Sequence, residues 1–366
     1  MATGFPVKNN YATGDVLTAA NMNDLSGTLN YLQYMPPRNP VLNSNFSVWQ
    51  RGTSVAVSAS TTAYTADRYS AQAQASQALT VSRQATSDTT NLPNIQYCAR
   101  VQRNSGQTGT GTIYFAQSLE TLNSIAFSGK AVTVSFYARA GANYSATSSA
   151  LPVYLWSGTG TDQNVNGGYT GANIVGSVTA TLTTTWQRFT FTGTVPATAT
   201  ELALQAQFIP TGTASTNDYF EVTGIQLELG SVANTYMPNQ PTYQGELAAC
   251  MRYCQMYNSA TANGTYYRFA SGGCDSTTSI DAPFLMPVPM RITPSLTTTG
   301  TASNYALYSA GSVTACSAVP SVGVNSSNPN AISFSASVAS GMTAGRAAAI
   351  MANNNNTAYL LLTAEL

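Results

Sequence analysis

Apolar side chains occupy every second position in many short runs between about residue 39 and residue 238. Alternation with a period of two is the pattern of a β-strand with one buried face. The clearest runs are Leu79 and Val81; Ile113 and Phe115; Val132, Val134 and Phe136; Phe189 and Phe191; and Leu202, Leu204, Ala206 and Phe208. Turns rich in Gly, Ser, Asn and Pro separate the runs, with no helical pattern between them. This arrangement predicts a large antiparallel β-sandwich of the jelly-roll type.

Two segments bound this region. NPVLNSNFSVWQRG, residues 39–52, is interpreted as the opening strand of the sandwich, and FEVTGIQLELGSVANTYMP, residues 220–238, as its closing strand. The apolar phase of the closing strand changes at Gly224, and a glycine inside a strand pattern predicts a β-bulge. Before the change Phe220 and Val222 are the apolar set; after it the set is Ile225, Leu227 and Leu229, with Gln226 and Glu228 expected to face water.

The chain is unusually poor in charge. Only 8% of its 366 residues are Asp, Glu, Lys or Arg, and 14 basic residues balance 14 acidic ones. A nucleic-acid-binding surface needs a basic stripe, and a polybasic membrane patch needs clustered Lys or Arg, so neither partner is expected. No stretch approaches the length of a membrane helix, so no membrane insertion is expected. Weak charge repulsion favours association, which predicts that the surface is organised in a fixed oligomer.

Histidine is absent from the sequence. Its absence excludes Ser-His-Asp and Cys-His nucleophiles and histidine-bearing zinc sites. No glycine-rich phosphate-binding motif follows a strand pattern, and no cofactor is expected. Hydrolysis of a glycoside needs only two carboxylates about 5 to 9.5 Å apart, so a hydrolase remains open, although we expect no enzyme. The candidate carboxylates are Asp67, Glu120, Asp218 and Glu221, and a calcium site at Asp67 or Asp218 is equally open.

Cysteine usage argues against a disulfide framework. The five cysteines are odd in number and scattered, which predicts free and largely buried thiols; they are Cys98, Cys250, Cys254, Cys274 and Cys316. Cys250 and Cys254 lie one helical turn apart and could share a metal ion. Because no second pair of ligands accompanies them, no metal site is expected.

Residues 1–36 are predicted to form a separate N-terminal segment. A helix capped by Thr18 and ending near Leu32 carries apolar residues at the 3, 4, 3 spacing of a coiled-coil seam. The seam consists of Met22, Leu25, Leu29 and Leu32. So short a helix needs partners, which would be copies of itself or a neighbouring protein. The alternative is a single helix packed on its own domain.

The sandwich is assigned to residues 37–240, and the pattern changes after it. A helix is expected at about residues 244–257, with Leu247, Cys250, Met251 and Cys254 on one face. Strand patterns then resume, and TAYLLLTAEL, residues 357–366, is predicted to be a strand whose carboxyl end is part of the fold. The fold class is therefore mainly β: a short N-terminal helix, a large jelly-roll-type sandwich, and a smaller C-terminal β domain, residues 241–366, with one helix.

Aromatic residues provide the candidate binding surface. In the strand pattern around residues 153–156, Val153 and Leu155 share one face, and Tyr154 and Trp156 share the other beside a glycine-rich loop that ends at Tyr169. Sugar rings pack on such aromatic faces while amides and hydroxyls bind their OH groups. The alternative places Trp156 in the core. Tyr266 and Tyr267 form a second candidate patch.

Several segments, in order along the chain, resemble bacteriophage tail-associated fibre proteins. GDVLTAANMNDL, residues 14–25, is similar to their N-terminal attachment segment. The segments similar to their carbohydrate-binding-module-like sandwich are NPVLNSNFSVWQRG, ADRYSA, GKAVTVSFYARA and GIQLELGSVANTY, and those similar to their C-terminal part are ELAACMRYCQMY, VPMRITPS and TAYLLLTAEL.

The resemblance implies a homotrimeric virion appendage, made in the host cytoplasm. Its N-terminus would attach to phage tail or baseplate proteins, and its β domains would bind a glycan or receptor on the host surface. It supplies no defined binding residue. Two alternatives remain: a tailspike-like polysaccharide depolymerase, and a purely structural virion component such as a head fibre or tail connector.

Overall fold

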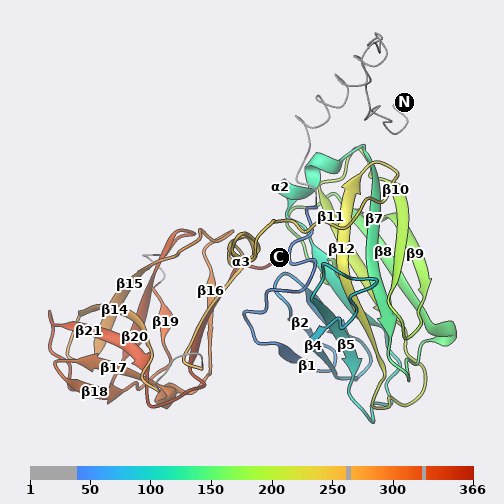
Figure 1. Ribbon diagram of the computed structural model, residues 1–366. Helices are drawn as coiled ribbons and strands as arrows, with labels where there is room; N and C mark the ends of the chain where they lie inside the picture. The colour runs from blue at the N-terminus through green and yellow to red at the C-terminus, as the bar shows by residue number, and fades with distance from the viewer. Residues whose placement is uncertain (1–38, 261–264, 324–326) are drawn as a thin grey trace, which may run out of the picture.

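The computed structural model describes residues 39–260, 265–323 and 327–366 (Figure 1). The predicted N-terminal helix, with Thr18 and the seam residues Met22, Leu25, Leu29 and Leu32, lies outside these described residues. The described part is mainly β, as predicted from the alternation. Among the described residues, no helix is long and apolar enough to span a membrane.

Two six-stranded antiparallel sheets face each other and form the sandwich predicted from the sequence. The first has the order β1 (Ser54–Val57), β4 (Leu79–Ala85), β5 (Tyr97–Arg103), β12 (Tyr219–Leu229), β7 (Ala131–Ala140), β10 (Gln187–Thr194). The second has the order β2 (Thr62–Tyr64), β3 (Ser70–Ala73), β6 (Ile113–Ser118), β11 (Glu201–Phe208), β8 (Ala150–Gly158), β9 (Asn173–Thr181). The short helix α2 (Thr121–Ser124) follows β6.

The core lies between the two sheets and contains the alternating residues of both. Leu202, Leu204, Ala206 and Phe208 of β11 all belong to it. Three rings pack together inside it: Phe46 is tilted against Tyr69 at 4.6 Å, and Tyr69 stacks on Phe115 at 5.1 Å, between ring centroids. Burying one such aromatic or leucine side chain contributes about 1.5–3 kcal/mol, so the alternation is the main stabilising pattern of the sandwich.

The bulge predicted at Gly224 is confirmed. The register between β12 and β7 shifts between Thr223 and Gln226, and Gly224 has a φ of 58°. The shift turns the residues on both sides of it toward the same core: Phe220, Val222, Ile225 and Leu227.

The expectation that Gln226 and Glu228 face water is wrong. Gln226 is 2% exposed and Glu228 is 9% exposed. The chain after β12 folds back over them, and the backbone N–H of Met237 donates to Gln226 Oε1 at 2.7 Å, while that of Asn234 donates to Glu228 Oε1 at 2.9 Å. Both outward side chains are therefore hydrogen-bonded beneath a loop.

The segment NPVLNSNFSVWQRG is not a strand, because residues 39–52 form turns and the first strand begins at Ser54. It binds the bulged strand mainly through a polar side chain, with one main-chain bond from the Ile225 N–H to the Ser44 carbonyl at 3.2 Å. Asn39 Nδ2 donates to the Ile225 carbonyl at 2.9 Å, and Asn39 Oδ1 accepts from the Leu227 N–H at 3.2 Å. The two bounding segments therefore meet at the bulge.

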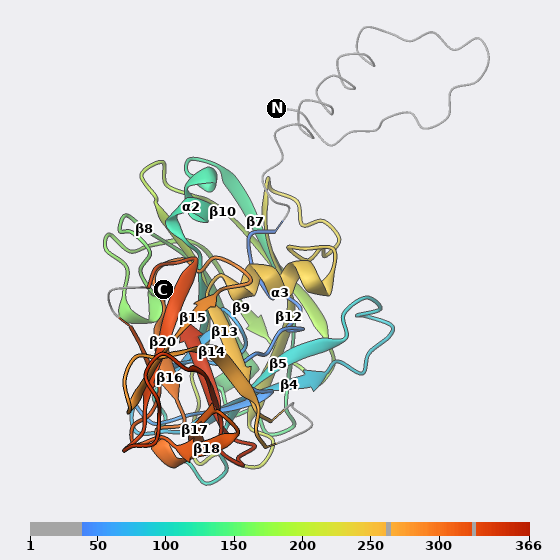
Figure 2. The ribbon, with the colours of Figure 1, turned by 90° about the vertical axis from the view of Figure 1, so that its left-hand side faces the viewer.

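After the sandwich, residues 243–366 form a C-terminal unit with a core of its own. It begins with α3 (Tyr243–Met251) and contains a three-stranded sheet of order β13 (Cys254–Asn258), β22 (Tyr359–Thr363), β16 (Ser295–Thr298). Its seven-stranded sheet has the order β18 (Ser312–Ala315), β17 (Tyr305–Ser309), β21 (Ala347–Ala352), β14 (Arg268–Cys274), β15 (Ser279–Leu285), β20 (Ala331–Ser337), β19 (Ser321–Val322). The unit lies beside the sandwich (Figures 1 and 2).

The helix predicted at about residues 244–257 is confirmed at its start, but it ends several residues earlier than predicted. Thr242 Oγ1 accepts from the Gly245 N–H at 3.2 Å and caps α3, which ends at Met251. Cys254 already belongs to β13, whose residues pair with β22. The apolar spacing that predicted one helical face therefore arises from a helix followed by a buried strand. All five cysteines are free and buried, as predicted.

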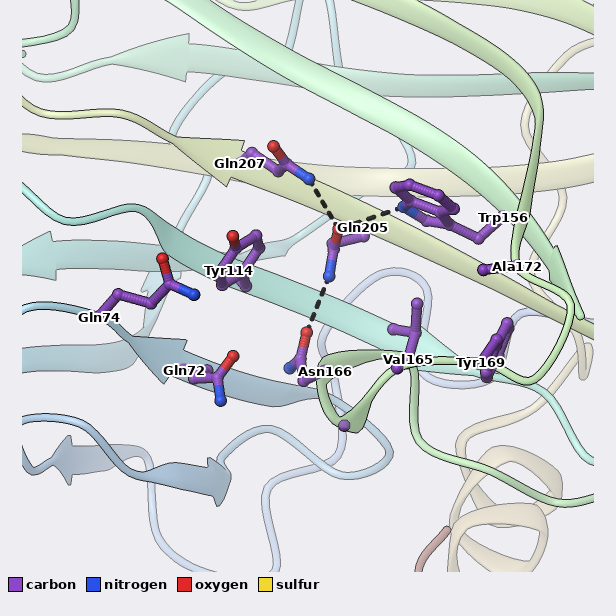
Figure 3. Close-up of a pocket in the computed structure, with 12 residues that line it drawn as sticks. Gln72, Gln74, Tyr114, Trp156, Val165, Asn166, Tyr169, Ala172, Gln205 and Gln207 are labelled. Atoms are coloured by element: carbon purple, nitrogen blue, oxygen red, sulfur yellow. Dashed lines mark hydrogen bonds between the residues drawn. The ribbon is translucent and has the colours of Figure 1, made fainter.

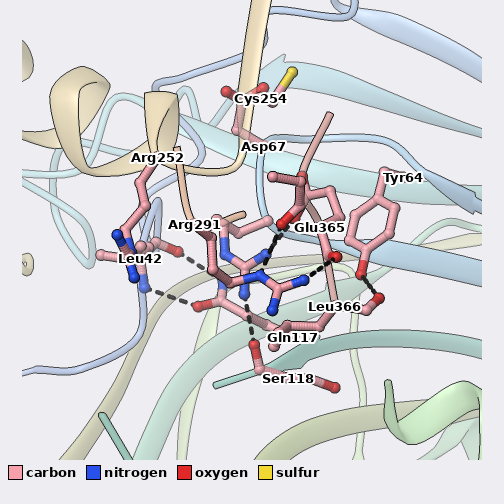
Figure 4. A network of polar contacts seen from close by, with 12 residues as sticks. Leu42, Tyr64, Asp67, Gln117, Ser118, Arg252, Cys254, Arg291, Glu365 and Leu366 are labelled. Carbon is pink, nitrogen blue, oxygen red and sulfur yellow. Dashed lines mark hydrogen bonds and ion pairs between the residues drawn. The ribbon is translucent and has the colours of Figure 1, made fainter. Parts of the chain in front are cut away.

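The carboxyl end of TAYLLLTAEL is part of the fold, as predicted, and its last residues contact the sandwich. Glu365 forms ion pairs with Arg51, at 3.0 Å, and with Arg68. The Tyr64 hydroxyl donates to the Leu366 main-chain oxygen at 2.7 Å (Figure 4). Two further ion pairs cross between the units: Arg252 with Glu120 at 3.0 Å, and Arg291 with Asp162 at 3.0 Å.

Candidate functional site

The outer face of the second sheet carries aromatic and amide side chains where the inner face carries aliphatic ones. In β8, Val153 and Leu155 point into the core, which turns Tyr154 and Trp156 outward. In β11, Gln205 and Gln207 occupy the outward positions. The strand register aligns these residues with those of β6 and β3, because Tyr114 faces Gln207 on one side and Gln72 on the other.

A groove of about 490 Å³ runs over this face (Figure 3). The loop between β8 and β9, which contains the short 3-10 helix η3 (Val165–Gly167), forms one wall. The lining residues are Gln72, Gln74, Tyr114, Trp156, Val165, Asn166, Gly167, Gly168, Tyr169, Ala172, Gln205 and Gln207. None of them carries a charge.

Gln205 forms hydrogen bonds with three other side chains that line the groove. Its Oε1 accepts from Trp156 Nε1 at 3.1 Å and from Gln207 Nε2 at 2.8 Å. Its Nε2 donates to Asn166 Oδ1 at 2.9 Å, and Asn166 Nδ2 donates in turn to Ser70 Oγ at 3.0 Å. The indole of Trp156 and the wall residue Asn166 are therefore fixed through one buried amide (Figure 3).

Other polar groups of the groove remain available to a ligand. The side chains of Gln72, Gln74 and Tyr114 form no hydrogen bond with any described residue. Gln74 is exposed, whereas Gln72 and Tyr114 are half-buried. An amide offers both donors and acceptors, and a phenol offers one of each, so these three side chains can bind hydroxyl groups.

The structure places three of the predicted aromatic residues at or beside the groove. Trp156 is half-buried on the outer face and does not belong to the core. Tyr169 also lines the groove, but it is 8% exposed and its hydroxyl donates to the Leu202 carbonyl at 3.1 Å, so it serves as a fixed wall. Tyr154 lies next to Trp156, with ring centroids 5.7 Å apart, and does not line the groove.

Tyr266 and Tyr267 lie in the C-terminal unit, away from the groove. Tyr266 is 49% exposed, whereas the ring of Tyr267 packs edge-to-face on Phe269 at 5.1 Å between centroids. The structure therefore does not join these two rings into one exposed aromatic surface.

Sequence reasoning did not identify the amides of the groove. Two Gln-Ala-Gln triplets, at residues 72–74 and 205–207, lie in or beside strands that pair with the same partner, β6. Each triplet turns its alanine inward and both its glutamines outward. The repeated triplet is the signal that could have located the groove.

The four candidate carboxylates lie outside the groove, and each has structural partners. Glu120 pairs with Arg252, and Asp218 pairs with Arg103 at 2.8 Å. Glu221 pairs with two arginines. Asp67 Oδ1 accepts from the Gln50 N–H at 2.9 Å, and burial raises the pKa of this carboxyl despite the nearby Arg51.

Cys250 and Cys254 do not gather further ligands. Both are buried, and the described residues contain no group of three or more Cys, Asp or Glu side chains that could hold a metal ion. Burial raises the pKa of both thiols, which disfavours the thiolate that a metal would need.

No protein-family model matches the chain, and no curated protein matches it. Among solved structures, one described as "CBM4 structure and function" is 22% identical over 36% of this chain and 71% of that chain, with a TM-score of 0.26. The enzymatically active domain of tailspike protein 4 from bacteriophage CBA120 is 14% identical over 53% of this chain and 22% of that chain, with a TM-score of 0.32. TmCBM61, solved with β-1,4-galactotriose, is 13% identical over 53% of this chain and 99% of that chain, with a TM-score of 0.29.

Proposed function

We propose that the groove on the second sheet binds an uncharged glycan chain on a host cell surface. The observation that carries this proposal is the half-buried indole of Trp156, fixed in an open and uncharged groove beside Gln72, Gln74 and Tyr114. A sugar ring presents CH groups that pack on an indole and hydroxyl groups that bond to amides and phenols.

The fixed geometry of the groove supports binding. Because Trp156 and Asn166 are already held by Gln205, a ligand need not order them, and less free energy is lost on binding. The absence of charged lining residues favours a neutral glycan over an acidic one. An anionic group would lose water in the groove without gaining an ionic partner.

We also propose that the chain is a trimeric phage tail fibre, located in the virion and made in the host cytoplasm. The segment 1–36 would form the attachment and oligomerisation part, residues 37–240 the binding sandwich, and residues 241–366 a further β domain. The 3-4-3 seam, the low charge and the ordered motifs support this role. Its partners would be two further copies, phage tail or baseplate proteins, and the host glycan, and the fibre would bind this glycan without cleaving it.

Glycan binding is tested with the full chain by affinity electrophoresis in gels that contain soluble galactan, xylan, β-glucan or host surface polysaccharide. Trp156→Ala should abolish the retardation that the wild type shows in at least one gel. Tyr266→Ala is the matched control, because it removes an exposed aromatic side chain outside the groove. Wild-type migration that no polysaccharide changes, or retardation that survives Trp156→Ala, would refute the proposal.

The fibre role is tested separately. Light scattering should give the mass of a trimer at micromolar concentration, and Leu25→Asp with Leu29→Asp should weaken assembly or tail attachment. A stable wild-type monomer would exclude the trimer. The recombinant chain should compete with phage for host cells, and failure to compete would favour a purely structural role. Release of oligosaccharides from the host polysaccharide would favour the depolymerase.

A further inference from the structure

The wall of the groove is bound to the C-terminal unit through a continuous set of hydrogen bonds. The Asn164 side chain caps η3 by accepting from the Asn166 N–H at 2.9 Å. On its other side, Asn164 Nδ2 donates to the Leu366 main-chain oxygen at 3.2 Å and to the Tyr64 hydroxyl at 2.9 Å. Asn166 then accepts from Gln205. The end of the C-terminal unit is thus connected to the groove through three side chains.

Arg291 joins the same two parts a second time. Its Nη1 donates to Asp162 Oδ2 at 3.0 Å, two residues before Asn164 in the wall loop. Its Nε and Nη2 donate to the carbonyls of Ala364 and Glu365 at 2.8 and 2.7 Å. Arg291 is 10% exposed, so these charged hydrogen bonds are partly shielded from water.

The wall loop also has contacts within the sandwich. Asp162 Oδ1 accepts from the Thr121 N–H at 2.8 Å, and Gln163 bonds to Glu201 and Thr170. These contacts hold the loop from the side of the sandwich. From the side of the C-terminal unit, Arg291 holds Asp162, and Asn164 binds the segment that carries Asn166 to Leu366.

We propose that Arg291 is a positioning residue for the groove: by binding both Asp162 and the segment 364–366, it couples the packing of the C-terminal unit to glycan binding. This inference rests on the proposed function of the groove. Coupling is reciprocal, so a glycan in the groove should also tighten the contact between the two units.

The matched control is Arg252. It also forms an ion pair across the two units, but its partner Glu120 precedes α2 and does not belong to the wall loop. Arg291→Ala should weaken binding to the polysaccharide that retards the wild type by roughly five- to tenfold, the low end of typical coupling between sites. Arg252→Ala should leave binding unchanged. Arg291→Lys keeps a positive charge for Asp162 but loses the two hydrogen bonds to the carbonyls of Ala364 and Glu365. It should therefore bind more tightly than Arg291→Ala and less tightly than the wild type.

Two readouts need no ligand. Amide hydrogen exchange in residues 159–172 should be faster in Arg291→Ala than in the wild type or Arg252→Ala. Acrylamide quenching of tryptophan fluorescence should rise in the same variant, because Trp156 is half-buried whereas Trp49 and Trp186 are 8% and 4% exposed. A saturating polysaccharide should in turn slow exchange in residues 359–366 of the wild type.

Equal effects of Arg291→Ala and Arg252→Ala on binding would overturn the inference, because they would show general loosening of the contact between units. Unchanged binding and unchanged exchange in Arg291→Ala would overturn it as well. If the wild type binds none of the polysaccharides, the proposed function fails, and the exchange and quenching results alone decide whether Arg291 positions the loop.

Discussion

Removing the charge of Asp218 should destabilise the sandwich strongly. Arg103 and Asp218 are both 0% exposed and pair at 2.8 Å between Nη1 and Oδ2. Arg103 also donates to Gln77 Oε1 at 3.1 Å, and its Nη2 reaches the carbonyls of Gly109 and Gly212, at 2.7 and 3.1 Å. The pair therefore holds together three connecting segments at one end of the sheets.

Asp218→Asn retains the shape of the side chain but leaves the guanidinium of Arg103 buried without a counter-ion. Breaking a buried ion pair in this way costs about 3–5 kcal/mol. For a unit the size of this sandwich, such a loss lowers the melting temperature by about 6–20 °C. The carbonyl bonds of Arg103 remain in the variant. Both oxygens of Asp218 accept from Ser145 at 2.9 Å, and an amide NH2 replaces one of these oxygens, so the measured loss includes a hydrogen bond as well as the charge.

Urea unfolding followed by tryptophan fluorescence measures this loss. The three tryptophans of the chain, Trp49, Trp156 and Trp186, all lie in the sandwich part, so the signal does not report on the C-terminal unit. Lys130→Gln, at an exposed position of the sandwich, is the control and should change the free energy of unfolding by less than about 0.5 kcal/mol. A loss below about 1 kcal/mol in Asp218→Asn would refute the reasoning, since the pair would then contribute no more than a surface ion pair.

Three further predictions concern stability and reactivity. Gly224→Ala should lower the free energy of unfolding by about 1–3 kcal/mol in urea titrations. The φ of Gly224 is 58°, and an added Cβ would lie 2.7 Å from Ile95 Cδ1 and 2.9 Å from Tyr137 Cδ2. An unchanged urea midpoint of unfolding would contradict the bulge geometry. Burial raises the pKa of the Glu246 carboxyl, so its contribution to stability is complete below the unfolded pKa of about 4.3 and is lost as pH rises through the raised value. Glu246→Gln should remove that part of the pH slope of the unfolding free energy, and a slope equal to that of the wild type would count against it. A thiol reagent should modify no cysteine of the native chain and all five in urea, since all are buried and burial raises the pKa of Cys250 in particular; rapid labelling of the native chain would disprove this.

The strands and the bulge could be predicted because their signal is local. A period of two fixes which side chains share a face, and the phase change at Gly224 is visible in a dozen residues. The pattern also placed Val153 and Leu155 opposite Trp156. It could not decide whether another layer covers the aromatic face, because that depends on how far the loop at residues 159–172 reaches.

The errors arise where distant segments meet. The strand pattern predicted that Gln226 and Glu228 face solvent, but a loop that follows the strand covers them. Residues 39–52 contain strand-like apolar residues, yet the Asn39 amide and a single main-chain bond of Ser44 join them to the bulged strand in place of a strand ladder. The helix that begins at Tyr243 ends before the predicted residue 257, because Cys254 pairs in a strand with Thr363, more than a hundred residues later. None of these partners is visible in a local pattern.

The ion pairs of Glu365 have a consequence for biosynthesis. Arg51 and Arg68 precede their carboxylate partner by 314 and 297 residues. At roughly 5–20 residues per second, a ribosome needs on the order of 15–60 s to reach Glu365 after Arg68 has emerged. During that interval the sandwich strands can pair, but both guanidiniums lack their carboxylate partner. The C-terminal unit also lacks β22, the middle strand of its three-stranded sheet, so it cannot complete its packing. A nascent chain interrupted in this interval would therefore carry two arginines without the carboxylate that neutralises them once Glu365 is in place.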